Sequence, residues 1–347
     1  MNIEDGEPVF EKLADVYPRR HYRWDNYVNQ SNDLVALSLH ADLGPESYSG
    51  TGVRRRGVWI DVNTGQLDTL PVLPAGTAFG FDSNENRWSF INDQQIRVSE
   101  SGHVLYWSCS HELHYSDMYR ERMVRYHPET GEKEVAYKPH DFVKSQPEVT
   151  NPNLEAGKLR NTVLSRDGRY AYGGVQANGV DGGRVIWGST FLFKYDFETH
   201  EFTRLCEEGD GFSHLYGITD DSKNLYVNFD GSRKLFSIDS GFTTTLDLPG
   251  ASKTNKVFWS DGGYLNDPTH NNLQYYDFFN NELVEISIPN WARSPQFSHD
   301  NSYAYFGLRD TDLLLRTSDL TEEAQVDTLT TLPDDVSRST LGILVLD

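Results

Sequence analysis

The chain has 347 residues, of which 37% are hydrophobic and 13% aromatic, and this is enough apolar side chain for a packed core. Its 31 Lys and Arg residues against 52 Asp and Glu residues give a formal net charge of −21. This charge argues against nucleic acid and membrane surfaces as partners, because both favour basic faces. The two cysteines, Cys109 and Cys206, are too few for a disulfide framework and are expected to be buried thiols. The N-terminal residues do not resemble a signal peptide and no apolar run is long enough for a membrane span, so we expect a cytoplasmic protein.

One short unit recurs along the chain. It consists of an apolar strand, a polar turn built on Asp, Ser, Gly or Asn, and a second strand rich in Tyr, Val and Leu. The clearest copies are TVLSRDGRYAYGGV (162–175), GITDDSKNLYVNF (217–229) and PQFSHDNSYAYFGL (295–308). Most copies are followed by a third strand and another turn, as in GVWIDVNTGQ (57–66). A unit of this kind, repeated at intervals of roughly 40 residues or more, predicts a radial array, and four strands per unit predict an all-β fold, the β-propeller.

We expect a single propeller domain over 1–347, with four strands, A to D, in each blade. The first five blades are predicted at about 21–73, 88–138, 159–207, 212–248 and 253–289, and a sixth begins at 293. The last segment, 339–347, resembles a third strand, and 6–14 resembles the fourth strand that would follow it. We therefore predict six blades, with the ring closed by pairing 8–14 with 341–346 in one blade. Seven blades are the alternative, if 310–333 forms a third and a fourth strand of its own.

The long connections between predicted strands all join strand B to strand C or strand D to the next strand A. In a propeller these connections lie on one rim, here called the upper face, while the A–B and C–D turns lie on the other. Since binding residues concentrate on long loops held by a rigid scaffold, the upper face over blades 1–3 is the predicted ligand-binding face. The long connections are 40–53, 74–91, 109–121, 139–159, 176–190 and, with six blades, 309–338.

The first candidate motif is CSHELHYSDMYRER (109–122), within one of these connections. His111 and His114 are three residues apart, a spacing that on a helical turn would point both rings the same way and would suit a metal ion. The pattern is not the HExxH motif of zinc proteases. The alternatives are an acid–base cluster that includes Tyr115, and ordinary loop polarity.

The second candidate is a ring of polar and aromatic residues, each five positions before the residue that ends strand A. Equal offsets from equivalent turns predict that these side chains surround the upper mouth of the central channel. Converging donors in an acidic protein suit a small anionic or carbohydrate ligand, and arginine suits a carboxylate through paired hydrogen bonds. The alternative is that they bond to neighbouring blades and channel solvent. The ring comprises Trp24, Gln94, Arg160, His214, Asn255 and Arg293.

The third candidate is QANGVDGGRVIWGST (176–190), whose glycines permit conformations closed to other residues. Trp187 in this segment is expected to stack on a sugar ring if the segment forms a lid or platform. The alternative is a plain surface hairpin.

The unit SRDGRYAYGG…FLFKYDFETHEFTRL resembles the repeat of TolB-like propellers over most of the chain. The segment at 6–38 followed by GVWIDVNTGQLDTL (57–70), and the segment at 105–132, are also similar in layout to oligogalacturonate lyases. That resemblance implies a cytoplasmic propeller that cleaves uronate oligomers by β-elimination with a bound divalent metal. The chain lacks the His-x-His motif of those enzymes, since His270 stands alone.

Two functions are therefore expected. The first is a lyase for acidic, uronate-containing oligosaccharides: Arg160 and Arg293 would neutralise the carboxylate, His214 or His111 would be the base, and Tyr115 would assist as acid. The second is a non-catalytic propeller whose upper face binds a protein partner. A concave pocket at the channel mouth favours the first, and a flat apolar patch favours the second.

Overall fold

The structure is a computed structural model, and the residues that it describes lie in or near its strands. They are 2–4, 7–9, 29–30, 34–42, 53–61, 63–71, 87–112, 119–136, 139–154, 156–182, 184–206, 211–219, 221–241, 243–246, 254–258, 262–267, 272–278, 280, 282–287, 296–297, 303–307 and 312–316. No helix among these residues is long and apolar enough to cross a membrane.

Strands β3 to β14 form three four-stranded sheets, in each of which consecutive strands pair antiparallel. The first contains β3 (Asn29–Gln30), β4 (Leu34–Asp42), β5 (Val53–Asp61) and β6 (Leu67–Thr69). The second contains β7 (Arg87–Val98), β8 (Val104–Glu112), β9 (Tyr119–Tyr126) and β10 (Lys133–Val135), and the helix α1 (Pro139–Lys144) follows it. The third contains β11 (Ala156–Leu164), β12 (Tyr170–Asp181), β13 (Arg184–Asp196) and β14 (Glu201–Arg204).

The C-terminal half continues the same pattern. The fourth sheet contains β15 (Phe212–Ile218), β16 (Asn224–Phe229), β17 (Ser232–Ser237) and β18 (Thr243–Thr245). The fifth contains β19 (Thr254–Phe258), β20 (Gly262–Asp267), β21 (Asn272–Asp277) and β22 (Glu282–Ser287). The sixth contains β23 (Gln296–Phe297), β24 (Tyr303–Gly307) and β25 (Asp312–Arg316).

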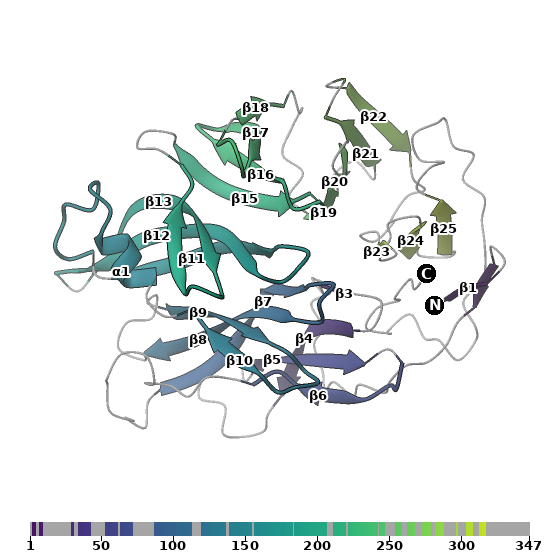
Figure 1. Ribbon diagram of the computed structural model, residues 1–347, viewed down its shortest axis with the longest axis horizontal. Coiled ribbons are helices and arrows are strands. Elements are labelled where there is room, and N and C mark those ends of the chain that lie inside the picture. The colour runs from purple at the N-terminus through teal and green to yellow at the C-terminus, as the bar shows by residue number, and fades with distance from the viewer. Residues whose placement is uncertain are drawn as a thin grey trace.

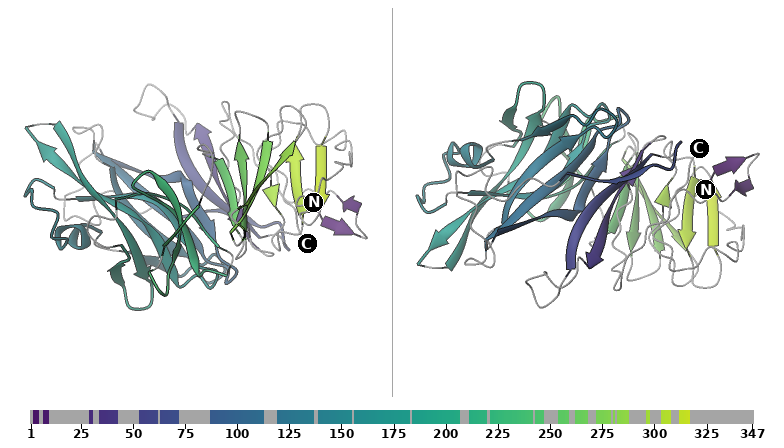
Figure 2. Two further views of the ribbon diagram at one scale, coloured as in Figure 1. Left: turned by 90° about the horizontal axis from the view of Figure 1, so that it is seen from above. Right: turned by 90° about the horizontal axis from the view of Figure 1, so that it is seen from below.

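The sheets stand side by side around a common centre, with the first strand of each nearest to it (Figure 1). Figure 2 shows the molecule from two sides, with the strands seen along their length. This confirms the predicted propeller of four-stranded meanders. The strand order also shows which strands each connection joins. The β4–β5, β8–β9 and β12–β13 connections each join a second strand to a third, and the β10–β11 connection joins a fourth strand to a first. The strand order therefore assigns these connections to one end of the sheets, as predicted.

Three expectations about the connections need correction. The segment 176–190 is not a loop, because β12 runs on to Asp181 and β13 begins at Arg184, so that the two strands form one long hairpin. In 109–121, the strands extend to Glu112 and resume at Tyr119, which places His111 within β8. The connection 139–159 contains α1 and the start of β11.

The sixth sheet corrects the assignment of its third strand. Asp312–Arg316 pairs with β24 as that strand, with Gly307 opposite Asp312 and Tyr303 opposite Arg316. The C-terminal segment 339–347 was expected in this position, with 309–338 as a long connection. Only the four residues 308–311 separate β24 from β25, so 309–338 is not a connection between these two strands, and this is the arrangement that the seven-blade alternative requires.

The N-terminal strand of the predicted closure has a partner in the structure. β1 (Asn2–Glu4) and β2 (Glu7–Val9) form a two-stranded antiparallel sheet in which Asn2 lies opposite Val9. Residues 10–14 and 341–346 lie outside the described residues. The pairing of 8–14 with 341–346, and with it the blade count, stays a prediction.

The second, third and fourth sheets are each buried on both faces, because one face packs on the preceding sheet and the other on the following sheet. Trp107 and Met123 of the second sheet form one core cluster with Phe193 of the third. On the opposite face of the third sheet, Tyr172 and Leu192 pack with Leu215, Val227 and Phe236 of the fourth. Cys206 belongs to this second cluster, and its burial confirms the expected buried thiol.

The repeated polar turn between the first two strands has one hydrogen-bonding pattern in the third and fourth sheets. The Ser165 amide donates to the Tyr170 carbonyl at 2.8 Å, and the Tyr170 amide donates to Ser165 Oγ at 2.9 Å. Thr219 and Asn224 repeat both bonds, at 2.9 Å and 3.1 Å. This pattern explains the recurrence of Ser or Thr at the end of strand A, since the hydroxyl closes the turn that the sequence repeats.

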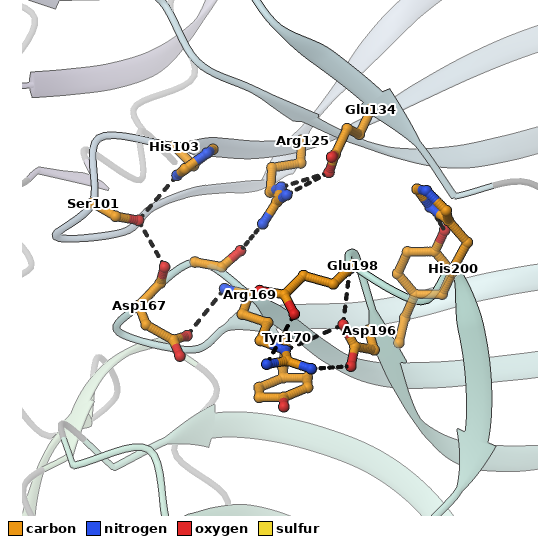
Figure 3. A network of polar contacts seen from close by, with 12 residues as sticks. Ser101, His103, Arg125, Glu134, Asp167, Arg169, Tyr170, Asp196, Glu198 and His200 are labelled. Carbon is orange, nitrogen blue, oxygen red and sulfur yellow. Dashed lines mark hydrogen bonds and ion pairs between the residues drawn. The ribbon is translucent and has the colours of Figure 1, made fainter.

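Neighbouring turns also bind one another, along what we call the lower rim. Ser101 Oγ donates to the Asp167 carbonyl at 2.8 Å, and the Arg166 amide donates to Ser222 Oγ at 2.9 Å. Arg125 donates to the Gly168 carbonyl at 2.7 Å while it pairs with Glu134 (Figure 3). These contacts tie the second, third and fourth sheets together at the rim opposite the predicted ligand face.

Candidate functional site

Two members of the predicted ring, Arg160 and His214, lie on neighbouring first strands, β11 and β15. Both side chains are half-buried. The two residues are 54 positions apart, and it is Asn161, the residue next to Arg160, that contacts His214. Of the other members, Gln94 lies in β7 and Asn255 in β19, and Trp24 and Arg293 lie outside the described residues.

A β-bulge in β11 sets the direction of Arg160. The pairing with β12 shifts between Arg160 and Thr162, so that Asn161 is an extra residue, with a φ of 21°. Because side chains alternate along a strand, the extra residue allows Arg160 and Thr162 to face opposite sides of the sheet. Thr162 faces the second sheet, where its Oγ1 accepts a 2.7 Å hydrogen bond from Trp107 Nε1. Arg160 consequently faces the fourth sheet.

Five residues of the third sheet share this face above its apolar layer, and we call them the blade 3 cluster. The register shows why they share it: Lys158 lies opposite Gln176, Arg160 opposite Gly174, and Asn178 opposite Trp187. On β12, Gly174, Gln176 and Asn178 follow Tyr172 at every second position, so they lie on the same face as Tyr172, which packs on the fourth sheet. The blade 3 cluster comprises Lys158, Arg160, Gln176, Asn178 and Trp187.

Within the cluster, Arg160 bonds to an amide and not to a carboxylate. Its Nη2 donates to Gln176 Oε1, and Gln176 Nε2 donates to the Gly188 carbonyl at 3.3 Å. None of the ion pairs among the described residues includes Arg160. The guanidinium thus retains donors for an anion, and Gln176 holds it in position.

Trp187 gives the cluster its apolar surface. It is 44% exposed and is the one large hydrophobic side chain found exposed in the part of the chain that the structure describes. Lys158 Nζ lies 5.2 Å from the centre of its ring, and Arg160 Cζ lies 5.6 Å from it. Both distances are within the range of cation–π attraction. An exposed aromatic ring beside two cations can stack on a sugar ring while a cation binds an acidic substituent.

Gly174 makes room for the stem of Arg160. A Cβ atom at this position would lie 3.0 Å from both Arg160 Cβ and Phe212 Cε1. The close approach allows the arginine to pass between β12 and the first strand of the fourth sheet. A side chain at 174 would displace one of these neighbours.

Asn178 adds an unmet hydrogen-bond acceptor to the same face. The residue is 1% exposed, and its Oδ1 has no hydrogen-bond donor among the described residues. Buried acceptors of this kind are rare and usually bind water or a ligand donor.

His214 is tied to the bulge residue Asn161. Asn161 Nδ2 lies 2.5 Å from His214 Nε2 and donates to the Leu215 carbonyl at 3.0 Å. Because an amide nitrogen can only donate, Nε2 is the acceptor and the neutral ring carries its proton on Nδ1. The His214 ring also lies 4.5 Å from the ring of Tyr216. To act as a base through Nε2, as predicted, His214 would first have to exchange the hydrogen bond from Asn161.

The structure places little of the motif 109–122. His111 lies in β8, opposite Trp88 on β7 and Tyr119 on β9, whereas His114 and Tyr115 lie outside the described residues. Among the residues that the structure describes, no three His, Cys, Asp or Glu side chains gather in a way that could hold a metal ion. We therefore assign no ligand to the divalent metal that the resemblance implies and derive no step through it.

The sequence interpretation missed Lys158, Gln176, Asn178 and Asn161. Lys158 stands two residues before Arg160, which is the spacing of one face of a strand, and this signal was available. Gln176 and Asn178 follow with the same spacing once 176–190 is interpreted as strand. Asn161 carried no signal, because a bulge leaves no mark in a pattern of period two.

Comparison with known proteins gives a fold and no family. No protein-family model matches the sequence, and no curated protein sequence matches it either. Among solved structures, an acylaminoacyl peptidase from Pyrococcus horikoshii is similar with a TM-score of 0.52 and 11% identity, over 88% of this chain and 46% of that one.

Two further structures are similar at lower scores. An oligogalacturonate lyase from Vibrio parahaemolyticus has a TM-score of 0.46 and 12% identity, over 84% of this chain and 82% of that one. A prolyl endopeptidase has a TM-score of 0.46 and 12% identity, over 83% of this chain and 40% of that one. This chain thus spans less than half of either peptidase. By its fold, the chain is a β-propeller.

Proposed function

We propose that the protein binds a carboxylate-bearing saccharide at the blade 3 cluster on its upper face. Arg160 would bind the carboxylate, and Trp187 would stack on the sugar ring. The observation that carries the proposal is the pairing of an exposed Trp187 with Lys158 and Arg160 in a chain of net charge −21. A local cationic site is what an anionic ligand requires on so acidic a protein.

The form of the exposed surface supports a small ligand over a protein partner. A docking face was expected to show a flat apolar patch. Over the described residues, the exposed large hydrophobic side chain is Trp187 alone, and two cations flank it. A single ring beside charged donors matches carbohydrate recognition, in which one ring stacks and a few polar groups orient the sugar.

The test is calorimetric titration of the protein with galacturonate oligomers and with the neutral galactose oligomers of the same length. We expect binding of the acidic series alone. Arg160→Ala should weaken it by about 1.5–3 kcal/mol, the value of a hydrogen bond to a charged group, and Trp187→Ala by roughly 1 kcal/mol.

The matched control is Arg166→Ala, which removes the same charge from an exposed arginine of the lower rim that pairs with Glu100. Its affinity should equal that of the unmodified protein. Equal affinity for acidic and neutral oligomers, or equal losses in the Arg160 and Arg166 variants, would overturn the proposal.

We also propose that binding at this face leads to β-elimination, the reaction expected from the sequence. Arg160 would neutralise the carboxylate and so acidify the adjacent C–H. His214 would be the base after exchange of its bond from Asn161, and His111 is the predicted alternative base. Tyr115 would assist as the acid that protonates the leaving oxygen. Ultraviolet absorbance of the unsaturated product would report the reaction. Binding without product would leave the saccharide proposal intact and remove the catalytic one.

A further inference from the structure

A second arginine near the same rim is buried among aromatic rings. Arg233, in β17, is 9% exposed. Its Cζ lies 4.7 Å from the centre of the Tyr216 ring and 5.9 Å from that of Tyr226. Its Nη1 donates a 2.8 Å hydrogen bond to the Tyr226 hydroxyl. The guanidinium is therefore held in one position by two rings and one hydrogen bond.

This buried cation has no counter-ion in the part of the chain that is described. None of the ion pairs found there includes Arg233. Tyr226 cannot supply the charge, because burial raises its pKa to about 12 and the phenol stays neutral. Buried arginine is normally paired with an anion, since desolvation of the charge is costly. The site is therefore suited to an anion from outside the protein.

The register places Arg233 near the upper face. His214 on β15 lies opposite Asn228 on β16, which lies opposite Arg233 on β17, so the three form one row of the fourth sheet. The next pair, Phe229 and Ser232, closes the hairpin between second and third strands. That hairpin and the β12–β13 hairpin that carries Trp187 join equivalent strands, so both belong to the upper rim.

A continuous series of contacts joins the two arginines. Asn161, next to Arg160 in β11, contacts His214, and the His214 ring lies 4.5 Å from the Tyr216 ring. Tyr216 in turn packs under Arg233. Arg160 faces the fourth sheet from the third, whereas Arg233 lies on the other face of the fourth sheet, beside the tyrosines that pack on Tyr276 of the fifth. A ligand bound by both arginines would therefore cross the upper edge of the fourth sheet.

We propose that Arg233 is a second carboxylate-binding position, so that the ligand is an oligomer whose acidic units are bound at Arg160 and at Arg233 in turn. This inference rests on the proposed function and deepens it, because it specifies a ligand with at least two carboxylates. It also assigns to Arg233 the second cationic role that the sequence interpretation gave to Arg293.

The experiment is a titration of the intact protein with galacturonate, its dimer and its trimer. In the unmodified protein, affinity should rise roughly tenfold or more once the oligomer is long enough to reach both arginines. Arg233→Gln should remove this gain but should not abolish binding of the monomer, which Arg160 still binds, whereas Arg160→Ala should weaken the binding of all three ligands. Arg166→Ala, on the lower rim, should change neither the affinity for the monomer nor the gain in affinity with oligomer length.

Two further variants separate binding from packing. Arg233→Lys keeps the charge without the planar fork and should retain only part of the gain, and it serves if Arg233→Gln fails to fold. Tyr226→Phe keeps the ring and removes the hydrogen bond to Arg233, so it should retain the gain. A purely structural role for Arg233 would lower thermal stability in these variants without changing the ratio of oligomer to monomer affinity.

The outcomes separate the two proposals. If no galacturonate of any length binds, the proposed function is wrong. If the monomer binds through Arg160 but the dimer and trimer bind no more tightly, or if Arg233→Gln keeps the gain, the inference about Arg233 is wrong while the proposed function stands.

Discussion

The bulge at Asn161 can be tested through Thr162, the residue that the bulge directs toward the second sheet. Thr162 is fully buried, Trp107 is 3% exposed, and their 2.7 Å hydrogen bond joins the second and third sheets. Thr162→Val keeps the volume of the side chain but removes the acceptor. The indole N–H of Trp107 would then be buried without a partner, which costs about 1–3 kcal/mol of the free energy of unfolding.

Urea unfolding followed by circular dichroism would measure this loss, provided that the slope with urea stays unchanged. Thr203→Val is the matched control: Thr203 lies exposed on β14 of the same sheet, and the change should stay within about 0.5 kcal/mol. The double variant Trp107→Phe, Thr162→Val should lose less free energy of unfolding than the two single variants lose together, and the difference should be about 0.5–3 kcal/mol. A loss in Thr162→Val no larger than in the control would refute the assignment of Thr162 to the face toward the second sheet, and with it the assignment of Arg160 to the face toward the fourth.

Two other predictions concern pH and the space beside Arg160. Burial, assisted by Arg125 and His127, lowers the pKa of His103 to about 4, so the unfolded chain takes up the proton first as the pH falls. The stability that neutral His103 contributes should therefore be lost between about pH 6.5 and pH 4. The urea midpoint of His103→Gln should fall less over this window than that of the unmodified protein. Equal falls in the two midpoints would contradict this prediction. Gly174→Ala places a Cβ atom 3.0 Å from Arg160 Cβ and Phe212 Cε1. It should lower the free energy of unfolding in urea by about 1–3 kcal/mol and weaken galacturonate binding. A variant with unchanged stability and affinity would show that this contact is not as close as described.

The sequence predicted the sheets well because their signals are local. The copies at 162–175 and 217–229 each contain a strand, a polar turn and a strand within a few residues, and the structure has those hairpins as β11–β12 and β15–β16. The turn chemistry was visible too, since Ser165 and Thr219 are hydrogen-bonded within their own turns. The error at 176–190 came from reading glycines as loop residues, although β12 and β13 continue through most of this segment as a paired hairpin.

The site could be predicted only in part, because its contacts are between strands and between sheets. The ring assumed equal heights from equal offsets, but register shifts interrupt the first strands, at Asn161 in β11 and at Ser213 and Tyr216 in β15. Each shift moves the residues before it relative to the turn. Arg160 and His214 still lie on the first strands of neighbouring sheets, whereas the role proposed for Arg233, on the third strand of its sheet, could not be inferred from an alignment of first strands.

The most direct test of the central claim is a crystal structure of the protein with a galacturonate trimer. We expect one carboxylate of the ligand within hydrogen-bonding distance of the Arg160 guanidinium, with a sugar ring stacked on Trp187. A trimer bound away from the blade 3 cluster, or an Arg160 engaged by a carboxylate of the protein itself, would contradict it.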